Sequence, residues 1–173
     1  KNRGPNDEGV FVNKQNNLGL AFQRLSILDL NQSANQPMFS KNKNWVMVYN
    51  GEIYNYRELK KLINIKSGFW KTTSDTEVTL ELIAKYGFLK AIPKLNGMFS
   101  IAAYCFSTET LWLARDKFGE KPLYYNYTAE EGLLFGSDIR SFFLYPYLKK
   151  TLNKEATAQY IRSVSYTHLT LPT

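Results

Sequence analysis

The stretch WVMVYNGEIYNYREL, residues 45–59, decides the fold. Its first five residues, 45–49, form an apolar run that is too short for a helix and rich in β-forming residues, so it predicts a strand buried on both faces. Asn50 and Gly51 follow directly. This pair predicts a sharp backbone turn, because Gly tolerates positive φ and Asn often does. We therefore expect the strand to end there, at one edge of the core.

The same pair carries a candidate chemistry. An Asn side-chain amide beside a backbone N–H can form an oxyanion hole, in which both donors face one developing negative charge. Glu52 adds a carboxylate directly after Asn50 and Gly51. The plain alternative is a hairpin turn without chemistry, because Asn-Gly is the commonest short hairpin signal.

Helices are expected where capping signals precede helical patterns. Asn55 and Glu58 have the spacing of a capping box, which predicts a helix beginning at Tyr56. Ser74 and Glu77 repeat this spacing and predict a second helix. The expected helices cover residues 56 to about 65, 74–86, 138–143 and 153–162.

The remaining apolar segments read as strands in hairpin order. Two helices are inserted after the central strand, and the other strands follow one another through short turns. This order argues against a βαβαβ parallel fold and predicts an α+β sandwich with mostly antiparallel sheets. The expected strands cover residues 10–12, 18–30, 45–49, 97–106, 111–115, 122–125 and 133–135.

Composition narrows the class of protein. The chain has 173 residues, of which 44% are hydrophobic and 15% aromatic, as is typical of one globular domain. The formal net charge is +7, but the Lys and Arg residues are scattered along the chain. A nucleic-acid footprint needs cations clustered on one face, so we expect no nucleic-acid partner. No apolar run reaches membrane-spanning length, so we expect no membrane partner either.

Cys105 is the single cysteine, which excludes an internal disulfide and suits a reducing, cytoplasmic setting. It lies inside an expected strand, where we interpret it as a small core residue rather than a nucleophile. The sequence contains neither a Gly-rich phosphate loop nor the Cys/His spacing of a metal site. We therefore expect no metal and no cofactor in this domain.

Two charged residues have both a structural and a functional interpretation. Arg24 lies among apolar residues of an expected strand, where its stem could cover apolar surface. Its guanidinium could equally bind a carboxylate in a bidentate fashion. Asp75 stands in the first turn of the second helix, where it would complement the helix dipole.

Several segments, taken in order, resemble the asparagine synthetase family. The resemblance is to the amino-terminal class II glutamine amidotransferase (glutaminase) domain of that family, and it runs from about residue 3 to residue 162. The segments are RGPNDEG from Arg3, RLSILDL from Arg24, YNGEIYNY from Tyr49, SDTEV from Ser74, NGMFSIAAY from Asn96 and ARDKFGEKPLYY from Ala114. The family fold is a four-layer αββα sandwich of the amino-terminal-nucleophile hydrolase type, which agrees with the order of strands and helices.

The resemblance implies a role for each candidate residue. Arg24 would bind the α-carboxylate of glutamine, while Glu52 and Asp75 would bind its α-ammonium group. The side chain of Asn50 and the N–H of Gly51 would form the oxyanion hole. Backbone groups would line the glutamine pocket at Leu25, Ser26, Ile27 and Leu28.

In this family the nucleophile is a cysteine at the mature amino terminus, whose own α-amine serves as the base. The resemblance places that cysteine upstream of residue 3, so we expect this chain to be a fragment without glutaminase activity of its own. Its folding in isolation is also in question, because a missing first strand would leave an unpaired sheet edge.

The intact parent is expected to hydrolyse glutamine and to pass ammonia to a carboxyl-terminal synthetase domain that binds ATP and Mg²⁺ and amidates aspartate. The expected partners are glutamine and that synthetase domain, with a homodimer left open. Two alternatives remain from the residues alone. The acceptor could be another carboxylate, such as a surface-polysaccharide sugar acid, or the domain could be a non-catalytic relic that mediates interactions.

The last ten residues do not continue the resemblance. We assign residues 1–163 to a partial amidotransferase domain and residues 164–173, VSYTHLTLPT, to a non-native tail. The tail has no helical period, and it matches a reading frame through a transposase library adaptor. We therefore expect a sequencing artefact in which His168 has no role, and resequencing across residue 163 tests this.

Overall fold

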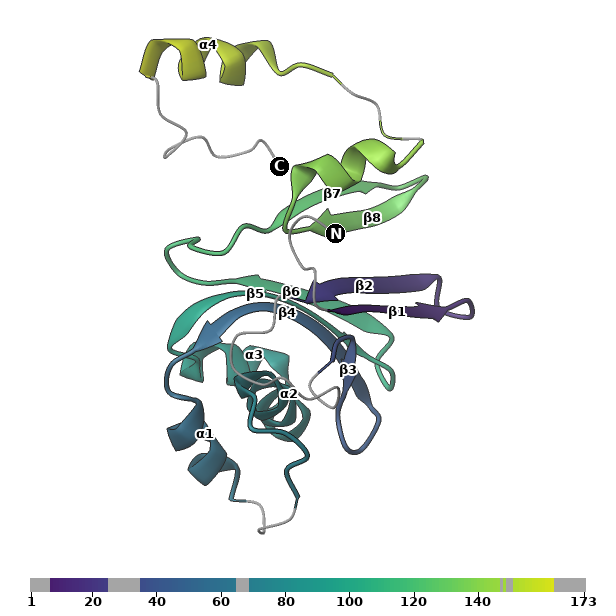
Figure 1. The fold of residues 1–173 in the computed structure, drawn as a ribbon. Coiled ribbons are helices and arrows are strands. Elements are labelled where there is room, and N and C mark those ends of the chain that lie inside the picture. The colour runs from purple at the N-terminus through teal and green to yellow at the C-terminus, as the bar shows by residue number, and fades with distance from the viewer. Residues whose placement is uncertain (1–6, 25–34, 65–68, 147, 149–150, 164–173) are drawn as a thin grey trace. The chain divides into compact units, whose positions relative to one another are not determined.

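The computed structural model describes residues 7–24, 35–64, 69–146, 148 and 151–163 (Figure 1). The chain divides into two compact units, Lys1–Tyr124 and Tyr125–Thr173. Each unit is built from antiparallel strands and helices, as the hairpin order of the sequence predicted. No helix in the described part of the chain is both long and apolar enough to cross a bilayer.

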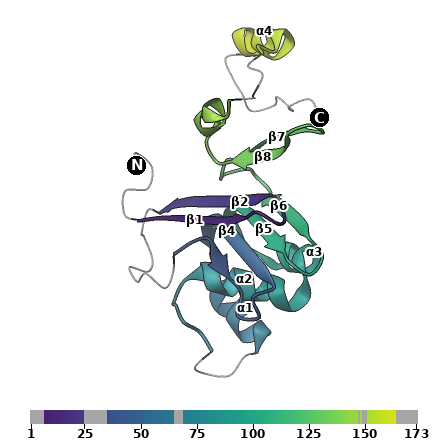
Figure 2. The same ribbon diagram turned by 90° about the vertical axis from the view of Figure 1, so that its right-hand side faces the viewer.

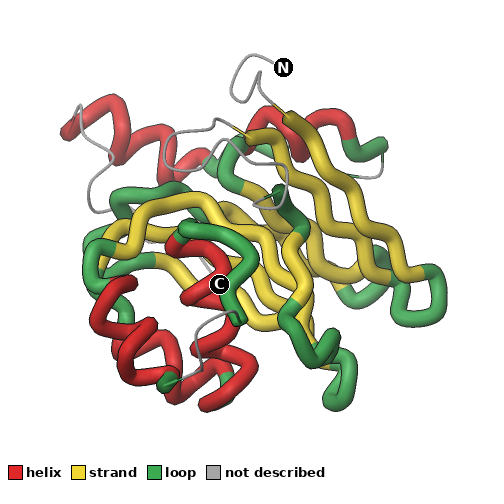
Figure 3. The backbone as a smooth tube through the Cα atoms, turned by 60° about the horizontal axis from the view of Figure 1, so that its bottom comes forward, coloured by secondary structure: helices red, strands yellow, loops and turns green. Residues whose placement is uncertain are grey.

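The first unit is organised around a four-stranded antiparallel sheet with the strand order β3-β4-β5-β6. Helices pack on one face of this sheet and enclose the apolar core (Figure 3). The strands are β3 (Met38–Phe39), β4 (Trp45–Ile53), β5 (Gly97–Cys105) and β6 (Thr110–Arg115). The helices are α1 (Tyr56–Ile63), α2 (Asp75–Tyr86), α3 (Phe88–Ala91) and the 3-10 helix η2 (Ile92–Lys94).

A two-stranded hairpin covers the other face of the sheet (Figure 2). It consists of β1 (Asp7–Asn13) and β2 (Leu18–Arg24), paired antiparallel over their full length. The ring of Phe11 on β1 contacts Phe39 edge-on at 5.1 Å between centroids and Phe106 at 6.2 Å. The first unit therefore has three layers, namely helices, sheet and hairpin.

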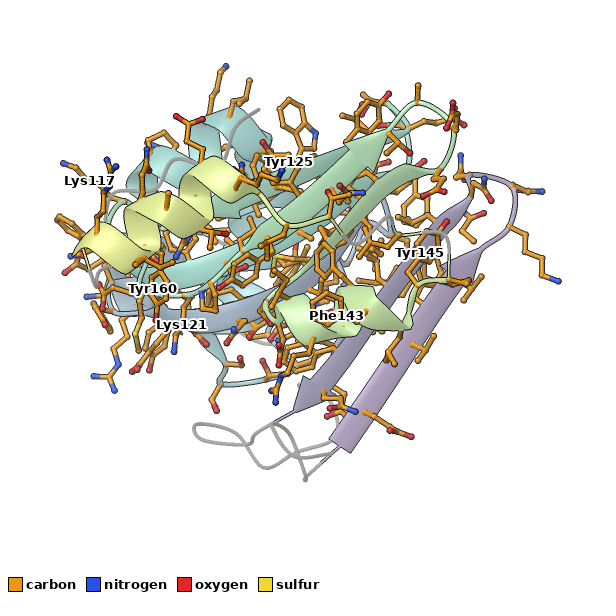
Figure 4. All side chains as sticks on the ribbon, turned by 90° about the horizontal axis from the view of Figure 1, so that it is seen from above. Lys117, Lys121, Tyr125, Phe143, Tyr145 and Tyr160 are labelled. Atoms are coloured by element: carbon orange, nitrogen blue, oxygen red, sulfur yellow. The ribbon has the colours of Figure 1, made fainter. Side chains whose placement is uncertain are left out.

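The second unit is a smaller hairpin with helical segments. It contains β7 (Tyr124–Thr128), β8 (Gly132–Gly136), the 3-10 helix η3 (Ile139–Leu144) and α4 (Lys154–Ser163). Asp138 begins η3 by accepting a hydrogen bond from Arg140 N–H at 3.0 Å, so the helix expected over 138–143 is present as a 3-10 helix. Figure 4 shows the large side chains of this unit, among them Tyr125 and Phe143, which are at least half exposed.

The expected turn at Asn50 and Gly51 is wrong. β4 continues through both residues to Ile53, and they pair with β5 opposite Ser100 and Phe99. Gly is nevertheless required here, because a Cβ on Gly51 would lie 2.1 Å from the Met98 carbonyl oxygen. The pair marks a close approach of two strands rather than a reversal of the chain.

The expected cap of α1 is also wrong, although the helix begins at Tyr56 as predicted. Asn55 makes no side-chain capping bond to the helix. Its amide instead donates to Lys94 O at 3.0 Å and accepts from Asn96 N–H at 3.0 Å, because the preceding strand brings it beside that loop. α1 ends at Ile63, before Asn64 in the left-handed conformation.

The second predicted helix is confirmed as α2. Ser74 caps it by accepting a hydrogen bond from Thr76 N–H at 3.1 Å. Glu77 does not complete a capping box, because its carboxylate accepts hydrogen bonds from the N–H and hydroxyl groups of Thr72 at 2.8 and 2.9 Å. The first part of the strand expected over 18–30 is β2, and residues 25–30 lie outside the described residues.

Candidate functional site

Strand alternation decides which backbone groups of β4 remain open. Phe106 N–H donates to Asn44 O at 2.9 Å, and at the other end of the same pairing Tyr54 N–H donates to Asn96 O at 2.8 Å. Even-numbered residues of β4 therefore exchange hydrogen bonds with β5, and odd-numbered residues turn their N–H and C=O groups to the opposite edge. The Gly51 N–H belongs to this second set.

β3 occupies that edge only opposite Val46 and Met47. Beyond β3, the Gln36 side chain bonds to the same edge of β4. Its Oε1 accepts from Tyr49 N–H at 2.5 Å, and its Nε2 donates to Tyr49 O at 3.0 Å. No strand in the described part of the chain pairs with Gly51 on this side. The Gly51 N–H is thus turned to an edge that β3 does not reach.

On the other side of Gly51, a buried carboxylate accepts hydrogen bonds at the edge of β4. Asp75 Oδ2 accepts hydrogen bonds from Ile53 N–H at 2.8 Å and from the Tyr49 hydroxyl at 2.6 Å. Asp75 is 4% exposed, so both bonds are shielded from water. The edge of β4 is therefore satisfied at Tyr49 and at Ile53, on either side of Gly51.

Three effects raise the pKa of the Tyr49 hydroxyl above its ordinary value. The largest is burial, followed by the negative charge of Asp75 and the hydrogen bond to Asp75. The Glu52 carboxylate adds to this effect. Tyr49 therefore remains a neutral donor to Asp75 throughout the physiological range. The second Asp75 oxygen, Oδ1, accepts a long hydrogen bond of 3.5 Å from the Ser74 hydroxyl.

Asn50 and Glu52 point to the opposite face of β4 from Tyr49 and Ile53, since successive strand side chains alternate. Tyr49 and Ile53 pack in the core under the helices, whereas Asn50 is exposed and Glu52 half-buried. The strand thus presents an amide, a carboxylate and the Gly51 backbone within three consecutive residues.

Four of the expected site residues lie at this part of β4. Asn50, Gly51 and Glu52 are consecutive residues of the strand. The carboxylate of Asp75, from the start of α2, bonds to Tyr49 and Ile53 on either side of them. Arg24 is the last residue of β2, opposite Asp7 in the hairpin. Its side chain lies outside the described residues, as do the four expected pocket residues Leu25, Ser26, Ile27 and Leu28. Their roles in glutamine binding remain predictions.

Comparison with known proteins places this chain in a family. The model of the family described as "Glutamine amidotransferase domain" matches residues 1–171. The chain belongs to this family. It is 41% identical over 155 residues to asparagine synthetase [glutamine-hydrolyzing] 2 of Bacillus subtilis, and 35% identical over 141 residues to asparagine synthetase B of Escherichia coli. These matches cover 89% and 82% of this chain but only 20% and 24% of the relatives.

A solved structure of glutamine phosphoribosylpyrophosphate amidotransferase from B. subtilis shares the fold. The two superpose with a TM-score of 0.59 at 22% sequence identity, over 72% of this chain and 28% of that one. The expected fold class is thereby confirmed: this amidotransferase domain is an α+β protein of the amino-terminal-nucleophile hydrolase type, with antiparallel sheets.

Cys105 does not belong to the site of this amidotransferase domain. It pairs with Trp45, five residues along the strand from Asn50, which corresponds to about 17 Å at the usual rise per strand residue. Burial raises the pKa of its thiol, but hydrogen bonds from Ser107 and Thr108 outweigh burial and leave the pKa below its ordinary value. The thiol is nevertheless 4% exposed and packs in the core, as the sequence predicted.

Sequence reasoning missed two residues that form hydrogen bonds at the β4 edge of the candidate site, Gln36 and Tyr49. Gln36 lies in a segment with no periodic pattern, and Tyr49 reads as the last apolar residue of a buried strand. A buried Gln side chain bonded to a strand edge has no local sequence signal. Among the described residues, no three His, Cys, Asp or Glu side chains gather as a metal site.

Proposed function

We propose that this chain is the glutaminase part of a longer asparagine synthetase. In this reaction glutamine is hydrolysed to glutamate and ammonia, and the ammonia passes to a synthetase domain that amidates aspartate. The observation that carries the proposal is the edge of β4, where the Gly51 N–H is turned outward between the two satisfied positions Tyr49 and Ile53. A backbone donor held rigidly beside an Asn amide is the arrangement that an oxyanion hole needs.

The chemistry assigned to the residues follows from charge and hydrogen-bonding capacity. A thiolate attacks the side-chain amide carbon of glutamine, and the carbonyl oxygen becomes an oxyanion. The Gly51 N–H and the Asn50 side-chain N–H donate to that oxygen. Ammonia leaves after gaining a proton, and water then hydrolyses the thioester to glutamate and restores the thiol.

Charged residues hold the amino-acid end of glutamine in this proposal. Arg24 binds the α-carboxylate, for which a planar guanidinium offers two parallel donors. Glu52 and Asp75 take the α-ammonium group. For Asp75 this assigns the contact to Oδ1, because Oδ2 already accepts two hydrogen bonds from the protein.

The nucleophile in this proposal is an amino-terminal cysteine ahead of residue 3. Cys105 is excluded because it lies in the core at the far end of the same strand pair. A coding sequence that begins with Met-Cys upstream of this chain supports the enzyme. Any other residue in that position supports a relic domain that has kept the fold without the reaction.

The carboxylate contact of Arg24 gives the most direct test of the proposal. In the full-length protein, Arg24→Ala should raise KM for glutamine and leave kcat less affected, because losing the contact costs about 2–4 kcal/mol, roughly 30- to 700-fold. Arg57→Ala is the matched control, since Arg57 is an exposed arginine on α1 whose guanidinium contacts Tyr56. Unchanged glutamine kinetics in Arg24→Ala would rule out the assignment of Arg24.

The acceptor is a separate part of the proposal. Aspartate is favoured because the relatives from B. subtilis and E. coli are both named asparagine synthetases. ATP and Mg²⁺ act in the synthetase domain of the longer protein. Asparagine formation from aspartate, ATP and glutamine tests this directly, and amidation of a sugar acid instead would overturn the choice of acceptor while keeping the glutaminase.

A further inference from the structure

The Gln36 side chain occupies the place of a strand neighbour. β3 pairs with β4 so that Met38 lies opposite Met47, and the same register places Gln36 opposite Tyr49. At this position a main-chain peptide group would donate one hydrogen bond and accept one. The Gln36 amide makes both bonds instead, at 3.0 Å to Tyr49 O and 2.5 Å from Tyr49 N–H.

This substitution of a side chain for a main chain has a consequence two residues further along β4. A strand that continued in register would next place its backbone opposite Gly51 and cover the Gly51 N–H. A side-chain amide has one donor and one acceptor function at its tip and cannot extend a ladder. Gln36 therefore satisfies Tyr49 with its side chain, and the pairing of β3 with β4 in the described part of the chain stops short of Gly51.

We propose that Gln36 is a positioning residue of the glutaminase site: its side-chain amide ends the sheet edge at Tyr49 and thereby fixes the Gly51 N–H toward the substrate oxygen. This inference rests on the proposed function. It goes beyond that function by assigning a role to a residue that does not touch the substrate.

The main chain of Gln36 is itself clamped by β1. A Cβ on Gly9 would lie 1.9 Å from Gln36 O and 3.2 Å from Pro37 Cδ, so the two backbones are in direct contact. Gln36 is also only 7% exposed. The Gln36 amide therefore bonds to Tyr49 from a buried position on a backbone in contact with β1, while Asp75 accepts from the Tyr49 hydroxyl.

The same strand edge contains a matched control. Ser40 makes a comparable contact at the start of β4: its Oγ accepts from Trp45 N–H at 2.9 Å, whereas Trp45 O accepts from the Ser40 backbone N–H at 2.9 Å. Trp45 lies four strand residues from Tyr49, about 13 Å away. Loss of the Ser40 hydroxyl therefore removes the same kind of contact from the same edge, far from Gly51.

The test uses the full-length protein with Gln36→Met, Gln36→Glu and Ser40→Ala. Active sites are counted by covalent titration with a diazoketone analogue of glutamine, so that kcat refers to folded sites only. For both Gln36 variants we expect kcat for glutamine hydrolysis to fall about 10- to 100-fold with KM within about twofold, because an oxyanion donor acts in the transition state. Ser40→Ala should keep kcat within about twofold even if its melting temperature falls equally.

Amide hydrogen exchange provides a second measurement that does not depend on activity. In Gln36→Met the Tyr49 amide should exchange at least about tenfold faster, because the hydrogen bond from Tyr49 N–H to Gln36 Oε1 is lost. Residues 49–51 should be unaffected in Ser40→Ala. If Gln36→Met gives no titratable sites, Gln36→Glu decides, since its carboxylate can still accept from Tyr49 N–H.

The outcomes separate this inference from the proposed function. A wild-type enzyme that hydrolyses glutamine, with Gln36 variants that keep kcat or change only KM, overturns the role of Gln36 alone. A wild-type protein without glutaminase activity overturns the proposed function and this role together. Unchanged exchange of the Tyr49 amide in Gln36→Met shows that Gln36 does not hold the β4 edge beside Gly51.

Discussion

Asp116 ties the loop after β6 to β5, the strand that pairs with the candidate site on β4, and replacing it tests how β5 is held. Its two carboxylate oxygens accept four backbone hydrogen bonds and it is only 6% exposed. The donors are the N–H groups of Phe99 at 3.2 Å, Phe118 at 3.1 Å, Glu120 at 2.9 Å and Lys121 at 2.9 Å. Phe99 is the register partner of Gly51, so this carboxylate supports the backbone beside the candidate oxyanion hole.

Asp116→Asn preserves the shape of the side chain but not its bonding. One of the two oxygens becomes an NH₂ group, which faces N–H donors instead of accepting from them. Two of the four backbone N–H groups then lose their acceptor, and each buried loss costs about 1–3 kcal/mol. Because Phe118 and Glu120 are exposed and water can reach their N–H groups, we expect the free energy of unfolding to fall by about 2–4 kcal/mol.

The loss should depend on pH with a defined sign. Burial raises the pKa of Asp116, but the backbone N–H groups of Lys121, Glu120, Phe99 and Phe118 outweigh burial and hold the pKa below its ordinary value. A depressed carboxyl pKa gives stability that is present above the unfolded-state pKa of about 3.9 and is lost as the pH falls through the folded-state pKa. The difference between wild type and Asp116→Asn should therefore be largest near pH 7 and shrink in acid.

Urea unfolding of the full-length protein, followed by the fluorescence of the buried Trp45, measures this difference. Asp138→Asn is the control, because Asp138 caps η3 through Arg140 N–H and Asn is as good a cap. Its cost should stay within about 0.5 kcal/mol. A cost for Asp116→Asn below 1 kcal/mol at pH 7, or one that is equally large at pH 2.5, would refute this account of Asp116.

Three further substitutions test other contacts. Tyr49→Phe removes the buried donor to Asp75 and should lower the free energy of unfolding by about 1.5–3 kcal/mol, measured by urea unfolding; a loss below 0.5 kcal/mol would contradict the bond. Gly51→Ala places a Cβ 2.1 Å from Met98 O and should lower the melting temperature by several degrees, about 1–3 kcal/mol, whereas Gly19→Ala, with open space around the Cβ, should not. Burial raises the pKa of Glu81. Its negative charge therefore opposes folding above the unfolded-state pKa of about 4.3. Glu81→Gln should accordingly be neutral or stabilising at pH 7, and a clear loss of stability in thermal melts would count against this sign.

Local sequence determined the type of each main element. The apolar run over 45–49 predicted the buried part of β4, and the signals at Tyr56 and Ser74 placed the starts of α1 and α2. The predictions of β4 and α2 succeed because hydrophobic periodicity and capping depend on residues within one turn or one strand of each other, whereas α1 begins at Tyr56 without the expected Asn55 cap. The motif YNGEIYNY also placed Asn50, Gly51 and Glu52 next to one another, because neighbours in sequence remain neighbours in any fold.

Tertiary structure decided how these pieces are bonded. Asn50 and Gly51 form a turn or a strand according to whether another strand lies beside them, and the 46 residues of sequence between Gly51 and Met98 contain no local sign of that approach. The bonds from Gln36 to Tyr49, across 13 residues, and from Tyr49 to Asp75, across 26 residues, are set by the register of β3 on β4 and by the packing of α2. Hydrogen-bonding groups that are unpaired within their own segment bond to whichever partner packing brings to them. The direction of the Gly51 N–H, toward the edge of β4 that β3 does not reach, is therefore a property of the folded sheet.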